Sequence, residues 1–473
     1  MSQYQNDPFF EGAPQPQPQP LPQPPQPAPK KKGKKVLFSI LGVVIVVAVF
    51  FAGVGSASLF YDDGLKSLLW FKDQIDKTYY KDISDEDFWA AAIQGVENDL
   101  LDIYSQYYTA EEFDRVVSES QGRMDGLGLA FFSGTNKIAR VSIGSPAFYA
   151  SKDADFPIET GLNLTGAGAS REELVSFFTY EDMEKQLSRY TSGDTVCLRF
   201  TQEEVHSEQE LSSASNTYVT LTYAPYQESY VLYAADGRAW AYLNGEGGWQ
   251  DVSAYVSLDE KVSGDTAVLR FVEFNGNAAD EFVLALQQFK EDDKQELLLD
   301  LRNDGGGDLR VLSDVAQFLM KDAPAQNPVV LYARYKNGMQ VNYTAEKNLY
   351  GNYLEGKKVY VAANRNTASA SEALMGAMID YGTVDYGDIF LTDTEGKGFA
   401  RTYGKGIMQT SYSNTRTGEA VKLTSAQIFW PNGNSIHDVG ITTEDGAVAV
   451  PAASFGEYDD SELTEILNRI AAA

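Results

Sequence analysis

The sequence predicts a multidomain fold that combines a membrane-anchor helix, a helical segment, a mixed α+β domain and a larger α/β core. Three observations support this prediction. Residues 36–55 form an uncharged apolar run, residues 119–205 hold glycine-punctuated strands beside one helix, and buried strands alternate with helices after residue 265. At roughly 150 residues per domain, a chain of 473 residues suffices for two or three folded units.

Composition excludes several classes of protein. The single cysteine, Cys197, rules out an intrachain disulfide framework and a cysteine-cluster metal site. Two histidines, His206 and His437, leave little for a histidine-rich metal centre. The chain carries 38 Lys and Arg against 67 Asp and Glu, a net charge of −29. This acidity argues against a nucleic-acid partner, because phosphate binding needs a basic surface.

Residues 1–35 form a basic, proline-rich tail. Ten of the 17 prolines lie in residues 8–29, in a Gln-Pro alternation that predicts an extended tether without a core. Five lysines follow within residues 30–35, with only Asp7 and Glu11 opposing them, so the tail carries +3 and the rest of the chain −32. This charge asymmetry marks a domain boundary.

The apolar run at 36–55 predicts one transmembrane helix, because its length suits a hydrocarbon core ~30 Å thick. Lysines lie only on its N-terminal flank, and Asp62 and Asp63 follow it. The positive-inside rule therefore predicts a single-pass cell-membrane protein with a cytoplasmic N-terminus and an extracytoplasmic remainder. A cleaved signal peptide is the alternative, because Gly55-Ser56-Ala57 offers small residues to a peptidase. The long N-terminal tail favours the anchor.

Residues 56–118 predict a helical segment. Apolar residues recur at helical spacing from Leu65 to Ile75. Ser84, with Asp87 three residues later, predicts the N-cap of a second helix. Thr109-Ala110-Glu111-Glu112 predicts the start of a short third helix.

Residues 119–205 predict a domain that can bind a peptide terminus. The loop Gly126-Leu127-Gly128-Leu129 leads into an apolar strand, and a helix at 178–190 and a strand at 195–200 follow. Backbone N–H groups of such a loop can bind a terminal carboxylate while the peptide adds to the sheet as a strand. Taken alone, the same pattern is also typical of a plain turn.

The segment 206–473 predicts an α/β domain. Its first part, to about residue 260, becomes β-rich with a hairpin turn at Asp236-Gly237, and we assign no chemistry to it. Apolar strands then alternate with helices, which is typical of a sheet covered on both faces. The predicted strands are 267–274, 297–301 and 358–363, and the predicted helices are 278–289, 309–319 and 371–381.

Two turns in this domain join a buried strand to a helix, where free backbone N–H groups suit an oxyanion. The first, Asp300–Gly307, lacks the Gly-Lys-Ser/Thr ending of a phosphate loop. In the second, Asn366–Glu372, small residues surround Ser369 at the start of a helix. The alternatives are a plain tight turn for the first, and a serine that only caps the helix for the second.

A nucleophilic serine needs a base. His206 lies in a charged segment and His437 in a stretch rich in Pro, Gly and Asn, and a solvated side chain is the simpler interpretation of both. A lysine can serve instead if burial lowers its pKa. Lys405 is a candidate because glycines flank it and apolar residues follow, although an isolated lysine is usually solvated.

Short motifs occur in a fixed order over about residues 60–450. They are Ile93-Gln94-Gly95, Tyr104-Ser105-Gln106-Tyr107, Gly126-Leu127-Gly128-Leu129, Asp300-Leu301-Arg302-Asn303, Thr367-Ala368-Ser369-Ala370-Ser371-Glu372, Asp380-Tyr381-Gly382, Tyr403-Gly404-Lys405-Gly406-x-x-Gln409, Leu423-Thr424 and Pro431-Asn432-Gly433. This set resembles the C-terminal processing, or tail-specific, serine peptidases. The resemblance implies a PDZ domain at 119–205 and a crotonase-like peptidase core at 206–473, with no metal and no organic cofactor.

Carried over residue by residue, the resemblance implies a Ser/Lys catalytic pair. Ser369 matches the nucleophile, Lys405 the general base and Gln409 the residue that orients the lysine. The backbone N–H groups of Gly306 and Ala370 match the oxyanion hole. The loop from Gly126 to Leu129 would bind the C-terminus of a substrate.

Three features depart from the family pattern. Ser369 and Lys405 are 36 residues apart, a longer gap than usual, and residues 383–401 include a second Gly-Lys-Gly whose Lys397 is a rival base without a downstream Gln. The family's Asn-Pro-Gly-Gly is replaced by Asp304-Gly305-Gly306-Gly307, and the added acid can alter the oxyanion hole. The 119–205 stretch also lacks a clear Gly-Asp after Leu162, which bears on peptide binding.

The leading interpretation is a membrane-anchored serine endopeptidase that faces outward. Its expected partners are envelope or secreted polypeptides with free C-terminal tails, cleaved through an acyl-enzyme on Ser369. The alternative from another class is a catalytically silent PDZ scaffold, and a histidine-dependent hydrolase using His437 is a third. Intact Ser369, Lys405 and Gln409 favour the enzyme. Because the family often forms homo-oligomers through its terminal segments, a homo-oligomer is a candidate state.

Overall fold

The computed structural model describes residues 62–151, 158–243, 247–256, 262, 264–393, 396–453, 455 and 460–472. The chain divides into two compact units, residues 1–92 and 93–473. The predicted tail and the predicted membrane helix at 36–55 lie outside the described residues. Within the described part of the chain, no helix is both long and apolar enough to cross a bilayer.

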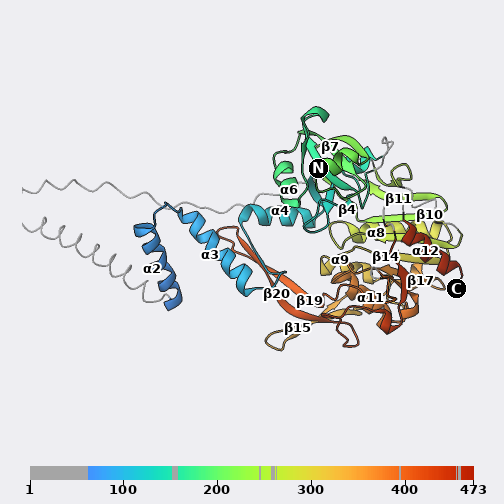
Figure 1. Ribbon diagram of the computed structural model, residues 1–473. Coiled ribbons are helices and arrows are strands. Elements are labelled where there is room, and N and C mark those ends of the chain that lie inside the picture. The colour runs from blue at the N-terminus through green and yellow to red at the C-terminus, as the bar shows by residue number, and fades with distance from the viewer. Residues whose placement is uncertain are drawn as a thin grey trace, which may run out of the picture. The chain divides into compact units, whose positions relative to one another are not determined.

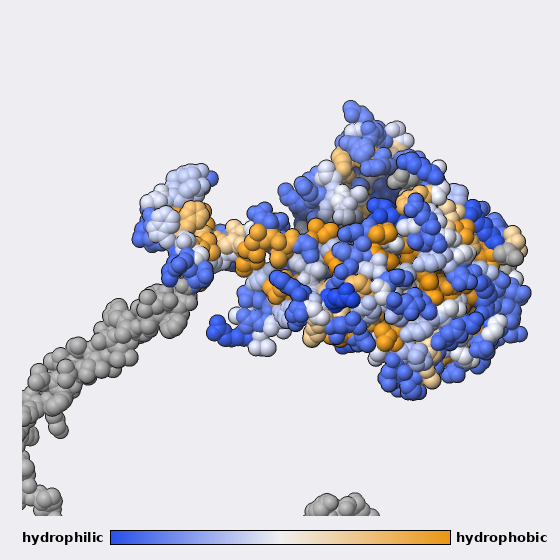
Figure 2. Space-filling model, turned by 90° about the horizontal axis from the view of Figure 1, so that it is seen from below, coloured by the Kyte–Doolittle hydropathy of each residue, from blue (hydrophilic) through white to orange (hydrophobic). Residues whose placement is uncertain are grey.

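The first unit ends in helical structure, as predicted. Helix α2 (Asp63–Thr78) begins at the N-cap Asp62, whose carboxylate accepts the Gly64 N–H at 2.7 Å. Helix α3 (Asp85–Leu100) begins after Ser84, whose hydroxyl accepts the Asp87 N–H at 3.0 Å, so the predicted N-cap is confirmed. Neither helix has a buried residue, and Trp70 and Phe71 of α2 are 64% and 53% exposed. Figure 2 shows apolar side chains on the surface of this helical segment.

An eight-stranded sheet forms the centre of the second unit, in the order β12-β11-β10-β13-β14-β17-β18-β21 (Figure 1). Its parallel part consists of β13 (Thr266–Phe271), β14 (Glu296–Asp300), β17 (Lys358–Ala363), β18 (Ile389–Asp393) and β21 (Val448–Pro451). Its antiparallel edge consists of β10 (Val231–Ala235), β11 (Arg238–Leu243) and β12 (Gly248–Asp251). Asp236 and Gly237 both have positive φ, as a two-residue hairpin turn requires.

Both faces of this sheet are buried, which explains why its strands are apolar throughout. On one face, Leu297 and Leu299 of β14 share a core with α8 (Ala278–Glu291), α9 (Leu309–Ala316) and α11 (Ala370–Asp380). On the other face, Leu298 belongs to a core that includes α12 (Ser461–Ala471). The carboxyl ends of β14 and β17 therefore lead into two helices on the same face, and this edge is where sites form in open α/β sheets.

A second sheet extends away from the first and carries the segment that follows Lys405. Figure 1 shows its long strands β19 and β20 extending away from the eight-stranded sheet. Its five strands are β1 (Gln106–Tyr108), β15 (Val329–Tyr335), β16 (Gln340–Thr344), β19 (Ile407–Ser413) and β20 (Ala420–Phe429). The short helix α10 (Tyr350–Tyr353) follows β16. Because β1 pairs with β20, the segment just before β1 lies beside the strands that follow the predicted base.

Short strands and helices from residue 110 to 227 form a separate β-rich layer. A four-stranded sheet has the order β6-β5-β7-β8, and β3-β4 and β2-β9 form two further antiparallel pairs. The strands are β2 (Arg123–Gly126), β3 (Leu129–Phe131), β4 (Ile138–Val141), β5 (Asn163–Gly168), β6 (Val175–Ser176), β7 (Thr195–Thr201), β8 (Asn216–Thr222) and β9 (Ala224–Gln227). The helices are α4 (Ala110–Ser120), α5 (Pro146–Ala150), α6 (Tyr180–Leu187) and α7 (Glu208–Ser213).

Two segments serve the fold differently from what the sequence suggests. β8 pairs with β7 and β9 pairs with β2, so strands of the predicted 119–205 domain continue past its predicted boundary at 205. The stretch 383–401, expected as extra residues between Ser369 and Lys405, contains β18. All five residues of β18 are buried between β17 and β21, so the long gap holds a strand of the main sheet.

Candidate active site

Ser369 lies in the turn between β17 and α11, at the carboxyl edge of the parallel sheet. Its φ of 58° and ψ of −114° form a conformation that L-residues rarely adopt. Ser369 and Glu372 are placed as in a capping box, and the Ser369 backbone N–H donates to Glu372 Oε2 at 3.0 Å, although the Ser369 hydroxyl accepts no capping hydrogen bond of normal geometry from the helix. A serine that only caps a helix needs no such strain, so the geometry favours an exposed, oriented hydroxyl over the capping alternative.

The buried carboxylate of Glu372 holds the segment around Ser369 to the segment around Lys405. Oε2 accepts the N–H groups of Ser369 at 3.0 Å and of Lys405 at 2.9 Å. Oε1 accepts the Gly404 N–H at 2.8 Å and the Thr402 hydroxyl at 2.5 Å. Because one oxygen binds both backbone N–H groups, residues 36 apart in sequence lie side by side. Burial raises the pKa of Glu372, and these four hydrogen bonds oppose the rise.

Lys405 is half-buried, and within the described residues no carboxylate forms an ion pair with it. Burial lowers the pKa of its ammonium group, and the positive charge of Lys422 lowers it further, while Asp102 and Glu372 oppose the change. Its Nζ lies 4.5 Å from the ring centroid of Tyr104, whose hydroxyl is 2.9 Å from that of Tyr403. A desolvated lysine with a lowered pKa has the property that a general base requires.

Gln409 lies on β19 and contacts the strand beside it. Its Nε2 donates to Thr424 Oγ1 at 3.0 Å, and the Thr424 N–H donates to Ser105 Oγ at 3.0 Å. Three of the sequence motifs therefore meet here through hydrogen bonds. The amide nitrogen is occupied by Thr424, so the expected contact with Lys405 would fall to the amide oxygen, and the role of Gln409 stays a prediction.

Gly306 lies directly over the nucleophile turn. A Cβ built on Gly306 would lie 2.8 Å from the Ala370 nitrogen and 2.8 Å from Ser369 Cβ, and its φ of +100° also favours glycine. Ala370 is the first residue of α11, where a backbone N–H has no acceptor within the helix. Gly306 and Ala370 thus lie together beside Ser369, and the Gly306 N–H donates to Asp304 Oδ1 at 2.9 Å.

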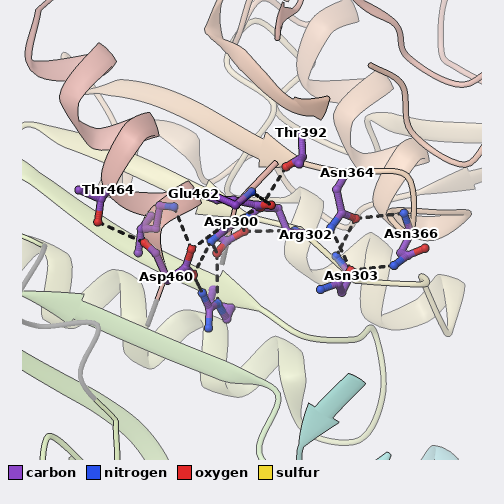
Figure 3. Close-up of polar contacts among 12 residues, drawn as sticks. Asp300, Arg302, Asn303, Asn364, Asn366, Thr392, Asp460, Glu462 and Thr464 are labelled. Carbon is purple, nitrogen blue, oxygen red and sulfur yellow. Dashed lines mark hydrogen bonds and ion pairs between the residues drawn. The ribbon is translucent and has the colours of Figure 1, made fainter. Parts of the chain in front are cut away.

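Asparagine side chains connect the two strand-to-helix turns (Figure 3). Asn303 Oδ1 accepts from the side-chain amides of Asn364 and Asn366, each at 2.9 Å, and Asn364 Oδ1 accepts the Asn303 N–H at 3.0 Å. The Asp304 carbonyl accepts the Ala368 N–H at 2.9 Å and the Ser371 hydroxyl at 3.1 Å. These bonds fix the position of the glycine turn relative to Ser369.

Behind the glycine turn lies a buried ion cluster, also drawn in Figure 3. Arg302 pairs with Asp300 at 2.7 Å, with Asp460 at 2.9 Å and with Glu462 at 3.2 Å. Arg270 pairs with the same two aspartates, and the cation pairs hold the pKa of Asp300 down at about 2 despite its burial. Because Asp460 and Glu462 stand at the start of α12, the C-terminal helix is bonded to the strand end that carries the glycine turn.

The rival bases are placed differently. Lys397 is exposed, and within the described residues the hydrogen bonds of Glu372 reach residues 402–405 and not residues 396–398. The His437 backbone packs against Gly406, and its Nε2 lies 3.6 Å from Asp438 Oδ2. His206 is exposed and lies 3.8 Å from Glu204. His437 therefore lies near Lys405, whereas the other two candidates stand on the surface.

The predicted peptide-binding loop joins β2 to β3. Gly126 and Gly128 have φ of +155° and +82°, and Leu127 between them is buried. A groove of 610 Å³ is lined by Phe131, at the end of β3, and by residues of α6. A strand and a helix that flank an open groove leave room for an extended peptide beside β3.

A cavity of 320 Å³ lies between the β3–β4 pair and the two turns of the site. Phe131 and Arg140 line it from one side, and Arg302, Asn303 and Asn366 line it from the other. Arg140 also pairs with Glu228 at 3.3 Å and with Glu273 at 3.1 Å, which lies just after β13. The predicted peptide-binding region and the turn that carries Ser369 thus border one cavity.

Sequence reasoning missed three contributors to this site. Glu372 was considered only as a partner in a helix cap, although its place three residues after Ser369 was a usable signal. Tyr104 belongs to a recognised motif, but no pattern pointed to its contact with Lys405. The acidic start of α12 carried no signal, because its partners Arg270 and Arg302 are far away in sequence.

Comparisons with known proteins find similarity to peptidases. Residues 265–445 match the profile of Peptidase family S41. The chain is 25% identical over 379 residues to a protein of Staphylococcus epidermidis named probable CtpA-like serine protease, covering 80% of this chain and 64% of that relative. It is 29% identical over 202 residues to the carboxyl-terminal-processing protease of Synechocystis, covering 42% of each chain.

Among solved structures, the photosystem II D1 C-terminal processing protease aligns with a TM-score of 0.43 and 20% identity, over 79% of this chain and 84% of that one. The chain spans 64% of the length of its staphylococcal relative. The resemblance seen in the motifs is confirmed by the family match and by these relatives. Residues 265–445 match Peptidase family S41, a family of serine-type peptidases, and the chain is similar to carboxyl-terminal processing proteases.

Proposed function

We propose that the chain is a serine endopeptidase that cleaves polypeptides through an acyl-enzyme on Ser369. The observation that carries this proposal is the Glu372 carboxylate, which binds the backbone N–H groups of Ser369 and Lys405 on a single oxygen. It brings a hydroxyl and a desolvated lysine to one edge of the sheet, where Gly306 and Ala370 also lie.

The chemistry follows from these positions. Neutral Lys405 takes the proton from Ser369 Oγ as that oxygen attacks the substrate carbonyl, and then gives it to the departing amine. Backbone N–H groups of Gly306 and Ala370 would bind the negative oxygen of the tetrahedral intermediate. Water then attacks the acyl-enzyme with the same lysine as base. Gln409 would orient Lys405 through its amide oxygen. No step needs a metal or an organic cofactor.

Recognition of the substrate's C-terminus is the second part of the proposal. The loop Gly126–Leu129 would bind the terminal carboxylate in a PDZ-like manner, and the groove between Phe131 and α6 would take the preceding residues. The cavity that joins this region to Asn303 and Asn366 supports passage of a tail toward Ser369. A crotonase-like core would carry the chemistry.

The proposed location rests on the sequence, and the proposed assembly rests on exposed apolar side chains. The apolar run at 36–55 and its lysine flank support a single-pass anchor with the peptidase outside the cytoplasm, acting on envelope or secreted proteins. The exposed Trp70 and Phe71 on α2 are consistent with a homo-oligomer.

The full chain, purified in detergent, would be tested on an unstructured protein with an apolar C-terminus. We expect the wild type and Lys397→Ala to cleave it, and Ser369→Ala and Lys405→Ala to leave it whole. Cleavage by Lys405→Ala but not by Lys397→Ala would contradict the assignment of the base.

The silent-scaffold alternative makes the opposite prediction for the same sample. A scaffold would bind the tail without cutting it, and a fluorophosphonate probe would not label its serine. No observation favours it, because Ser369, Lys405 and the turn that orients them are all in place.

A further inference from the structure

The predicted oxyanion donor Gly306 is already bonded. Its N–H donates to Asp304 Oδ1 at 2.9 Å, and Asp304 is fully buried. An N–H makes one strong, near-linear hydrogen bond at a time. In this conformation the Gly306 N–H therefore points at Asp304 and not at the position of a substrate oxygen beside Ser369.

The buried Asp304 carboxyl group has an incomplete set of hydrogen bonds. Within the described residues, its Oδ2 is buried and has no hydrogen-bond partner. A buried carboxylate left half-bonded is costly, so the group is poised to change its protonation or its contacts. Burial raises the pKa of Asp304 well above its usual range, and the nearby charge of Glu273 adds to the rise.

Other charged groups around Asp304 act in known directions. The Gly306 N–H and Arg140 on β4 lower the pKa of Asp304. The Ser371 hydroxyl of α11 also lowers it. The carboxylate of Glu372, on the same helix, bonds instead to Thr402, Gly404 and Lys405. Glu273 is therefore the acid that opposes ionisation of Asp304 from outside its own turn.

The turn is anchored at both ends and free in the middle. The Asp304 carbonyl bonds to Ala368 and Ser371, and the Gly306 carbonyl accepts the Phe274 N–H at 2.8 Å. Gly305 is exposed, and a Cβ built on it would meet nothing within 4 Å. Because both flanking residues are glycine, the peptide between Gly305 and Gly306 is freer to rotate than a peptide between bulkier residues. Such a rotation moves the Gly306 N–H without moving the anchored ends.

We propose that Asp304 is a positioning residue which, when ionised, holds the Gly306 N–H out of the oxyanion hole and, when protonated, releases it. This inference rests on the proposed function. An ionised acceptor makes a hydrogen bond about twice as strong as a neutral one, so deprotonation favours the blocked form. The negative charge would also repel the oxyanion that forms beside it. Activity would then rise with pH as Lys405 loses its proton, and fall again as Asp304 ionises.

The test measures the rate at which a fluorophosphonate probe labels the full-length chain in detergent between pH 6 and pH 10. We expect wild-type labelling to pass through a maximum and fall at alkaline pH. Asp304→Asn should lack that fall and label at least ~10-fold faster than wild type at the alkaline end, because one oxyanion donor is worth ~10²–10³ in rate. Asp308→Asn is the matched control, since Asp308 follows in the same turn but caps α9 and pairs with the exposed Arg310.

The outcomes separate this inference from the proposed function. Equal profiles for wild type and Asp304→Asn, or slower labelling of Asp304→Asn at every pH, would overturn the inference alone. If wild type and Asp304→Asn, like Ser369→Ala, remain unlabelled at every pH, the inference and the proposed function both fail. Asp304→Ser, with thermal unfolding measured for each variant, guards against misfolding of Asp304→Asn. If both variants unfold, a wild-type profile without an alkaline fall still refutes the inference.

Discussion

Replacing Glu372 by Gln tests whether this carboxylate holds the site together. Each of its oxygens accepts two hydrogen bonds: Ser369 and Lys405 donate to one oxygen, and Gly404 and Thr402 donate to the other. An amide has only one oxygen, and the Thr402 hydroxyl can accept as well as donate, so the NH2 group faces one N–H donor if it is turned toward Gly404 and two if it is turned toward Ser369 and Lys405. At least one bond to a charged group is therefore lost, at about 1.5–3 kcal/mol, which predicts a loss of at least that size in the free energy of unfolding.

Glu281→Gln is the matched control. Glu281 is equally buried, but Ser229, Tyr230 and Val231 all donate to its Oε2, so an amide can keep every one of these bonds. Burial also raises the pKa of Glu281 to about 7, so part of the population is already neutral at that pH. Urea unfolding at pH 8, with fluorophosphonate labelling of Ser369, would compare the two. Glu372→Gln should lose both stability and labelling, and Glu281→Gln should lose little of either. Wild-type stability and labelling in Glu372→Gln would refute the reasoning.

Four further predictions address the base, the ion cluster and the third mechanism. Lys422→Gln removes a positive charge that lowers the pKa of Lys405, so the acid limb of the labelling-rate profile should move to higher pH. An acid limb that does not move would show that Lys422 does not affect the titration of Lys405. Asp460→Asn removes a buried partner of Arg270 and Arg302 and should cost about 3–5 kcal/mol in urea unfolding, without selectively affecting labelling at low temperature. In the same cluster, the pKa of Asp300 is about 2 in the folded chain against a usual 3.8, so its contribution to stability is present above pH 4 and lost as pH falls toward 2. His437→Ala should label at the wild-type rate, and loss of labelling would favour the histidine-dependent hydrolase.

Most of the secondary structure could be predicted because local signals agreed with burial. The strand predicted at 358–363 matches β17 residue for residue, and the helix predicted at 278–289 matches the buried stripe of α8. The capping box of Thr109 and Glu112 opens α4 as expected. Such elements can be predicted because hydrophobic periodicity, capping residues and apolar content all indicate the same secondary structure.

The missed elements have a common physical cause. The residues of β18 are expected as part of an insertion because Ser369 and Lys405 are further apart than is usual in the family, whereas pairing with β17 and β21 makes them a core strand. β8 lies after the predicted boundary at residue 205, and its partner β7 lies before it. Strand pairing is a long-range property, and no local pattern reports it.

By itself the sequence determined the candidate chemistry of this protein. The glycine-rich turns, the serine at the start of a helix and the lysine between glycines are local features, and their order along the chain matched a known family. The tertiary structure decided how those residues act on one another. It placed the Glu372 carboxylate between Ser369 and Lys405, put Tyr104 against the lysine, and turned the Gly306 N–H toward Asp304. These relations depend on burial and on contacts between distant segments, because desolvation and hydrogen-bond direction are set by the folded surroundings of a group and not by its neighbours in sequence.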